Sequence, residues 1–193
     1  APSRGLGDVY KRQVYIVRYA VLDWGPTLLG EWKGVSIHHA GWMVAAFEIS
    51  GIVGMLVAGW ATDRFFGGRG PRVCVICMAL ATVFVALFWG ISQPPMWLAT
   101  LLLGAAGFCI YGPQALVGIA AANIATKKAA ATAVGFTGLF GYASTLVSGW
   151  GLGLLAQHYG WNIAVGALIL IAIMGTLIFM AAWSAKANGY DND

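Results

Sequence analysis

Arg18 is the residue whose surroundings most strongly indicate chemistry, because it lies within an apolar and aromatic run at residues 14–22. An arginine at the centre of a membrane helix costs about 2.5–3.5 kcal/mol on insertion scales, so it is usually retained for a task. Its guanidinium is planar, permanently charged and carries five N–H donors, which suits it to hold a phosphate or a carboxylate. Arg18 is therefore a candidate for binding an anion.

Two acidic residues, Asp23 and Glu48, also lie inside apolar segments. On a helix Asp23 points about 140° away from Arg18, because successive residues are about 100° apart. An unpaired carboxylate in a membrane is costly, so each acid predicts a cationic partner. Arg18 is the only basic residue within the predicted membrane segments. Either a carboxyl group is protonated or the missing partners lie on chain outside this sequence. In the alternative interpretation, Arg18 only neutralises Asp23 or Glu48.

Tyrosines accompany Arg18 in the sequence pattern. Tyr15 and Tyr19 share its helix face, since residues three and four apart are neighbours on a helix. Tyr111 and Tyr142 lie in later apolar segments close to glycines. All of them could donate hydroxyls to one cavity, although a tyrosine in such a place is more often part of a packed core.

The composition indicates that these residues are held in a membrane. The chain is 60% hydrophobic and 9% charged, whereas a soluble domain carries about 25% charged residues. A bilayer core about 30 Å thick needs about 20 apolar residues as helix. Six segments qualify, the first only in part, and the sequence predicts an all-α membrane protein. They are residues 14–29, 41–61, 73–91, 96–122, 130–156 and 162–183.

Small residues recur every fourth position in two of these segments. One stripe contains Ser50, Gly54 and Ala58, and a second contains Thr145, Gly149 and others. Such stripes let helix backbones approach closely inside a membrane, so they predict helix packing.

Other kinds of chemistry have little support. Cys74 and Cys77 form a C-x-x-C motif inside an apolar segment, without the second ligand pair that a zinc site needs. The histidines have no third and fourth ligand beside them, so no metal is expected. No P-loop, zinc-protease or nucleophile-elbow motif occurs, which argues against an enzyme and against a cofactor. No basic face with interleaved aromatics is present, so nucleic acid is not an expected partner.

Residues 1–13 differ from the rest of the chain. They show no helical period and stop abruptly at the apolar run, and they resemble a translated adapter tail. We therefore expect a non-native tail at 1–13 and a membrane domain at 14–193 whose first helix is truncated. The alternative is a native polar loop.

Basic residues alternate between the connections. Six lie on one side of the predicted bundle and only Lys33 lies on the other. The six are Arg64, Arg69, Arg72, Lys127, Lys128 and Lys186. By the positive-inside rule, that side and the C-terminus are predicted to be cytoplasmic.

Five motifs, in order, resemble the organophosphate:phosphate antiporters of the major facilitator superfamily. They are VYIVRYAVLDWGPT at 14–27, FEISG at 47–51, the loop at 59–70 with Asp63, Arg64 and Arg69, IYGPQ at 110–114, and KKAAATAVGFTGLFGY at 127–142. The loop at 59–70 resembles the cytoplasmic loop motif of the superfamily. Two departures do not touch the predicted site. Ala20 replaces a glycine that is frequent after the arginine–tyrosine pair, and His38 and His39 lie where charged residues are common.

The resemblance implies the C-terminal, six-helix half of a twelve-helix carrier in the bacterial inner membrane. Arg18 would be one of two arginines, one from each half, that hold the substrate phosphate. Tyr15, Tyr111 and Tyr142 match cavity tyrosines, while Asp23 and Glu48 match acids that pair with basic residues of the other half. The implied partners are a phosphorylated small molecule such as glycerol-3-phosphate or a hexose phosphate, inorganic phosphate, the missing N-terminal half and the lipid bilayer.

Two other functions stay open at this point. The same family includes a membrane sensor that binds a sugar phosphate and signals to a kinase. A facilitator of some other solute, with Arg18 purely structural, is the third interpretation. Which organophosphate would be carried is not specified by these motifs.

Overall fold

The computed structural model describes the backbone of residues 2–124 and 145–181, together with residues 132, 135, 138, 139 and 143. Side chains of residues 2–14, 32, 120–124, 147 and 179 are not described. Tyr142, one of the predicted site residues, lies outside the described residues.

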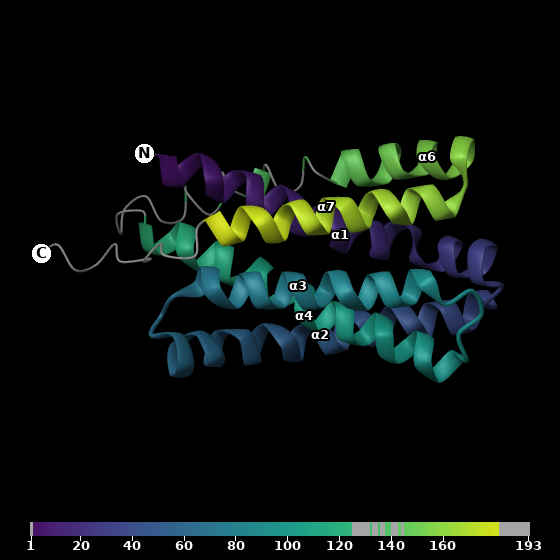
Figure 1. Cartoon of the computed structure of the whole chain (residues 1–193), viewed down its shortest axis with the longest axis horizontal. Coiled ribbons are helices and arrows are strands. Elements are labelled where there is room, and N and C mark those ends of the chain that lie inside the picture. The colour runs from purple at the N-terminus through teal and green to yellow at the C-terminus, as the bar shows by residue number, and fades with distance from the viewer. Residues whose placement is uncertain are drawn as a thin grey trace, which may run out of the picture.

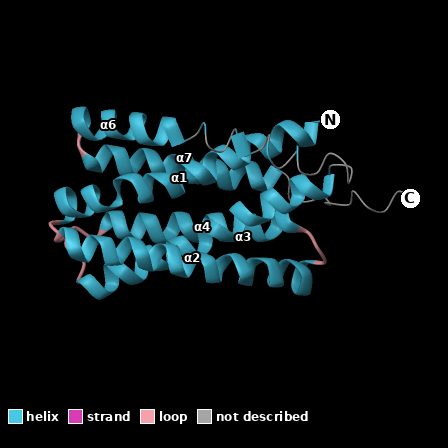
Figure 2. Ribbon diagram, turned by 180° about the vertical axis from the view of Figure 1, so that it is seen from behind, coloured by secondary structure: helices cyan, strands magenta, loops and turns pink. Residues whose placement is uncertain are grey.

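The described elements are all helical. The α-helices are α1 (Pro2–Lys33), α2 (Ile37–Phe66), α3 (Gly70–Gly90), α4 (Met96–Ile124), α6 (Leu152–Tyr159) and α7 (Trp161–Ala181), and a π-helix, η1 (Val147–Gly151), precedes α6. Figure 1 shows the long helices running side by side, with the α2–α3 connection and the start of α1 at one end. The α1–α2, α3–α4 and α6–α7 connections lie at the opposite end, as the view from behind also shows (Figure 2). Arg64 and Arg69 therefore lie at one end of the bundle and Lys33 lies at the other, as the alternation of charge predicts.

Four helices among the described residues are long and apolar enough to cross a membrane: Ile37–Phe66, Gly70–Gly90, Met96–Ile119 and Trp161–Ile178. They correspond to the second, third, fourth and sixth predicted segments. The first part of the fifth predicted segment, 130–156, is described only at scattered positions, whereas its last part, 145–156, is described without a gap.

The start of the first helix differs from the prediction. The sequence pattern begins the helix at Val14, whereas α1 begins at Pro2. A proline at the first helical position costs little, because its missing N–H would have no helical partner there. No other proline precedes Pro26, which lies inside α1, so the backbone of the polar run can stay helical. The non-native origin of residues 1–13 stays a prediction.

The stripe of small residues on α2 forms a close seam with α4. Ser50 Oγ donates to the carbonyl of Gly104 at 2.7 Å. A Cβ placed on Gly54 would collide with the backbone carbonyl of Phe108, and a Cβ on Gly112 would lie 2.8 Å from the Cβ of Ala58. The seam confirms that the α2 stripe is a helix-packing surface, and it fixes the position of α4 beside the site described below.

A second contact joins α1 to the π-helix. The Trp24 indole Nε1 donates to the Gly149 carbonyl at 3.0 Å, and its ring lies where a side chain at Gly153 would be, 2.6 Å from such a Cβ. Trp24 also stacks against Trp161 with ring centroids 6.0 Å apart, and Trp161 Nε1 donates to Glu31 at 2.8 Å. These contacts hold the last turns of α1 against η1 and α7.

Replacing Trp24 by phenylalanine tests this contact. The ring would be kept while the hydrogen bond to Gly149 is lost, and a neutral hydrogen bond is worth about 0.5–1.5 kcal/mol. We expect Trp24→Phe to lower the thermal midpoint of the detergent-purified protein by a few degrees. Trp89→Phe is the matched control, since Trp89 Nε1 donates to Asn162 in an exposed contact. Equal midpoints for the two variants would contradict this role of Trp24.

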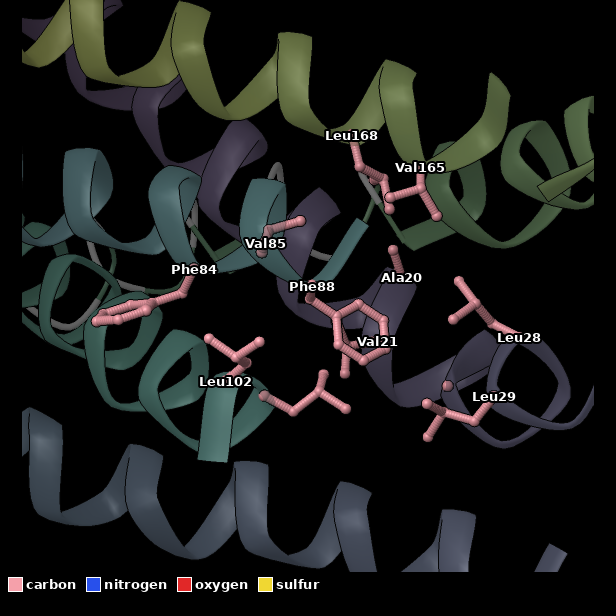
Figure 3. A pocket seen from close by; sticks show the side chains of 12 residues that line it. Ala20, Val21, Leu28, Leu29, Phe84, Val85, Phe88, Leu102, Val165 and Leu168 are labelled. Atoms are coloured by element: carbon pink, nitrogen blue, oxygen red, sulfur yellow. The ribbon is translucent and has the colours of Figure 1, made fainter. Parts of the chain in front are cut away.

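A small cavity of about 50 Å³ lies between α1, α3, α4 and α7. Its lining is apolar, as Figure 3 shows, and includes Ala20, Phe88, Leu102 and Val165. None of the predicted site residues lines it, so this cavity is separate from the site predicted around Arg18.

Filling this cavity should stabilise the bundle. Val165 is buried and lines the cavity, so Val165→Ile adds one methylene to empty space. At about 24 cal/mol per Å³ of cavity volume, the gain is about 0.5 kcal/mol. We expect a small rise in the thermal midpoint, whereas Val83→Ile, on an exposed position of α3, should leave it unchanged. A lower midpoint for Val165→Ile would show that the cavity cannot accept the added group.

Candidate substrate-binding site

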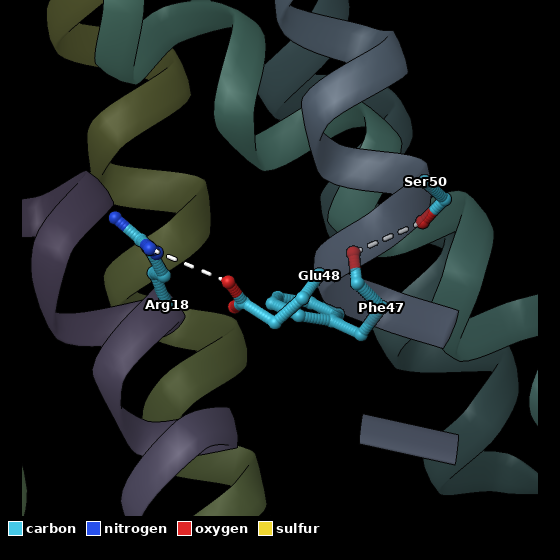
Figure 4. Close-up of polar contacts among 4 residues, drawn as sticks. All are labelled: Arg18, Phe47, Glu48 and Ser50. Atoms are coloured by element: carbon cyan, nitrogen blue, oxygen red, sulfur yellow. Dashed lines mark hydrogen bonds and ion pairs between the residues drawn. The ribbon is translucent and has the colours of Figure 1, made fainter. Parts of the chain in front are cut away.

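Arg18 of α1 reaches toward α2 and α4. Its Nη2 lies 3.5 Å from Oε2 of Glu48 on α2, and the two side chains point toward each other across the gap between the helices in Figure 4. The Arg18 guanidinium carbon lies 4.3 Å from the centroid of the Tyr111 ring and 5.4 Å from that of Tyr19. Three predicted site residues, Arg18, Glu48 and Tyr111, therefore lie together.

The structure contains the contact that the alternative interpretation expects, in which Arg18 neutralises Glu48. Arg18–Glu48 is the one ion pair among the described residues, and Asp23 takes no part in any ion pair there. The contact is weak, however. A charge-assisted N–H···O bond is usually about 2.7–2.9 Å long and often paired, whereas this one is a single contact at 3.5 Å.

Much of the hydrogen-bonding capacity at this pair is unused. Within the described part of the chain, Arg18 Nε, Glu48 Oε1 and the Tyr111 hydroxyl are buried and have no hydrogen-bond partner. Buried polar groups without partners are rare in native proteins, and each calls for an explanation. The side chains of Arg18 and Glu48 are still 18% and 31% exposed. The site thus combines a permanent positive charge, hydrogen-bond donors without partners and two partly exposed side chains.

The Tyr111 ring is held by packing. It sits against Gly51, where an added Cβ would lie 2.5 Å from the ring, and it contacts Phe47 edge-on with centroids 6.1 Å apart. Its ring face is therefore presented to the Arg18 guanidinium, an arrangement in which aromatic rings attract cations.

Tyr15 and Asp23 are two further predicted site residues on α1. Tyr15 is buried and pairs with Tyr19 at 5.7 Å between centroids. Asp23 is exposed and borders the π-helix near Gly149. Tyr19, the ring that Tyr15 contacts, lies 5.4 Å from the Arg18 guanidinium carbon, and the predicted roles of Tyr15 and Asp23 stay predictions.

The loop motif lies at the far end of α2. Asp63 and Arg64 are exposed in the last turn, and Arg69 precedes α3. The turn between them uses Gly67 and Gly68 with positive φ of 56° and 76°, a conformation that glycine adopts without strain. These residues do not contribute to the site around Arg18.

Gln114 is a polar residue of α4 that the sequence patterns did not single out. Its buried Oε1 also lacks a hydrogen-bond partner among the described residues. The IYGPQ motif contained it, and a polar amide inside an otherwise apolar helix was the signal that could have found it.

Comparison with known proteins agrees with this fold. The sequence profile described as Major Facilitator Superfamily matches residues 15–189. The chain therefore belongs to the Major Facilitator Superfamily.

The curated relatives confirm the resemblance to the organophosphate:phosphate antiporter branch. The chain is 39% identical to a probable hexose phosphate transport protein of Chlamydia pneumoniae, over 89% of this chain and 38% of that protein. It is 35% identical to the glycerol-3-phosphate transporter of Haemophilus influenzae, over 90% of this chain and 40% of that protein. It is 34% identical to the membrane sensor protein UhpC of Salmonella typhimurium, over 90% of this chain and 39% of that protein. The chain thus spans about two fifths of the length of these relatives.

A solved structure supports the fold. A peptide transporter in complex with alafosfalin superimposes with a TM-score of 0.72 at 13% identity, over 94% of this chain and 38% of that one. The described helices and this match define an all-α membrane protein that corresponds to a half of the twelve-helix facilitator fold.

Proposed function

We propose that the chain is the C-terminal half of a secondary carrier that exchanges a phosphate ester for inorganic phosphate. The observation that carries the proposal is the group of orphaned polar atoms around the Arg18 guanidinium, between α1, α2 and α4. A phosphate offers several acceptor oxygens and up to two negative charges, which match the unused N–H and O–H donors of Arg18 and Tyr111. The names of the relatives point to phosphorylated solutes as well.

Glu48 gives this site a means of exchange. In the absence of an anion, its single carboxylate contact at 3.5 Å partly compensates Arg18. A phosphate dianion carries more charge and can form two parallel bonds to the guanidinium, so it competes well for Arg18. Glu48 would then turn to a basic residue of the N-terminal half, as the family resemblance implies. Inorganic phosphate and an ester would compete for the same guanidinium.

The movement in this proposal is alternating access, in which two halves rock around a site near the bilayer midplane. A second arginine would come from the N-terminal half, and the end of the bundle with Arg64 and Arg69 would face the cytoplasm of a bacterial inner membrane. Tyr15 and Tyr142 are proposed as further contacts to the substrate.

The test is exchange in proteoliposomes made with the complete protein that contains this chain. Vesicles loaded with labelled inorganic phosphate should release it when glycerol-3-phosphate or a hexose 6-phosphate is added outside, and should retain it in buffer alone. Release without an external substrate would contradict obligatory exchange.

A second candidate function is sensing, which the likeness to the sensor UhpC favours. A sensor would bind the phosphate ester in the same vesicles without releasing labelled phosphate. Binding without exchange would therefore overturn the carrier and support the sensor.

A further inference from the structure

Gln114 carries an unexplained polar group beside the proposed anion site. Its Oε1 is fully buried and has no hydrogen-bond partner in the described part of the chain. Leaving a buried amide unpaired costs about 1–3 kcal/mol. A leucine at this position of an apolar helix would avoid the cost, so the amide calls for a partner that arrives from outside the described chain.

The position of Gln114 places it next to Tyr111. Both are on α4, three residues apart, and residues at this spacing are neighbours on one helix face. Tyr111 is the residue whose ring faces the Arg18 guanidinium at 4.3 Å. Gly112, about 100° round the helix from Tyr111, faces Ala58 and Cys77 instead. Gln114 therefore flanks the site and is not part of the seam between α2 and α4.

The chemistry of an amide differs from that of the donors around Arg18. Its carbonyl oxygen accepts a hydrogen bond and its NH₂ group donates two, so it pairs well with a hydroxyl in either orientation of the amide. The dianionic phosphate group of an ester has acceptor oxygens but no O–H, so it cannot donate a hydrogen bond to Oε1. The hydroxyls of the ester's organic part can.

We propose that Gln114 binds a hydroxyl of the organic part of the substrate and so selects hydroxyl-bearing phosphate monoesters over plain ones. This inference rests on the function proposed above. Arg18 would hold the phosphate group that all ligands share, and Gln114 would bind a hydroxyl of the organic group attached to that phosphate.

The experiment compares two ligands that differ in hydroxyls alone. Glycerol-3-phosphate and n-propyl phosphate would each compete with labelled inorganic phosphate for the complete, purified protein. One neutral hydrogen bond predicts that the parent protein prefers glycerol-3-phosphate by about two- to twelvefold. Gln114→Met, close in size but without an amide, should lose that preference and bind inorganic phosphate within about twofold of the parent. Gln114→Ala should do the same.

The outcomes separate this inference from the proposed function. A Gln114→Met protein that binds phosphate and still prefers glycerol-3-phosphate would overturn the role of Gln114 and leave the phosphate site intact. A parent protein that binds no phosphate would overturn both. Retained phosphate binding in the variants also reports that they are folded, and if Gln114→Met loses it, Gln114→Ala decides the question.

Discussion

Arg18→Ala is expected to reduce phosphate exchange by the complete carrier about 10- to 150-fold, because a hydrogen bond to a charged group is worth about 1.5–3 kcal/mol. The loss has two parts in this structure. The substrate loses its cationic partner, and Glu48 loses the group that lies 3.5 Å from it. Arg18→Lys keeps the charge but not the planar guanidinium that can form two parallel hydrogen bonds to a phosphate, so it should recover only part of the exchange rate. Initial rates of labelled phosphate release from proteoliposomes measure both variants.

Lys33→Gln is the matched control for Arg18. It also removes a positive charge from α1, and it keeps an N–H donor for the Ile91 carbonyl that Lys33 Nζ contacts at 2.5 Å. Exchange should stay within about twofold of the parent, because Lys33 is about 22 Å from Arg18 along the helix, beyond the screening length at physiological salt. If Lys33→Gln reduced exchange as much as Arg18→Ala, the effect would be one of net charge and the anion site would be wrong.

Among the described glycines, Gly54 is the position where a valine should lower the stability most. A side chain at this position meets the backbone carbonyl of Phe108, and a helix backbone cannot move aside as a side-chain tip can. Overpacking of a tight interface costs about 1–3 kcal/mol and occasionally more. Because α2 and α4 carry Glu48 and Tyr111, forcing them apart should also weaken phosphate binding. The thermal midpoint in detergent and the yield of monodisperse protein measure the effect.

Gly59→Val is the control for that substitution. Gly59 lies on the same helix, and nothing lies within 4 Å of a Cβ placed there. The thermal midpoint of the Gly59→Val protein should change little in either direction. A Gly54→Val protein as stable as Gly59→Val would mean that the α2–α4 seam is looser than the structure has it.

Sequence patterns could predict those parts of the fold that depend on local spacing. The Ser50, Gly54 and Ala58 stripe indicated close packing because its period is that of a helix face, and the structure places α4 against it. The partner helix was not predictable, since a stripe does not specify what it meets. The π-helix at Val147–Gly151 and the Trp24 bond to its carbonyl depend on a contact between distant segments, which no local pattern reports.

The candidate site was predictable to a similar degree. Arg18, Glu48 and Tyr111 were identified because a charge or a phenol is conspicuous in an apolar run, and the structure brings them together. Two alternatives for Arg18, an anion site and a pair with Glu48, could not be separated from the sequence. The 3.5 Å contact shows that both use the same guanidinium. Gln114 was missed because one polar amide in an apolar run is a weak signal, and the buried oxygen without a partner is visible only in the coordinates.

The most direct measurement of the central claim is equilibrium binding of labelled inorganic phosphate to the complete, purified protein, with and without a competing sugar phosphate. A site centred on Arg18 predicts saturable binding that a sugar phosphate displaces fully and that Arg18→Ala removes. Undiminished phosphate binding in Arg18→Ala, or binding that a sugar phosphate cannot displace, would contradict it.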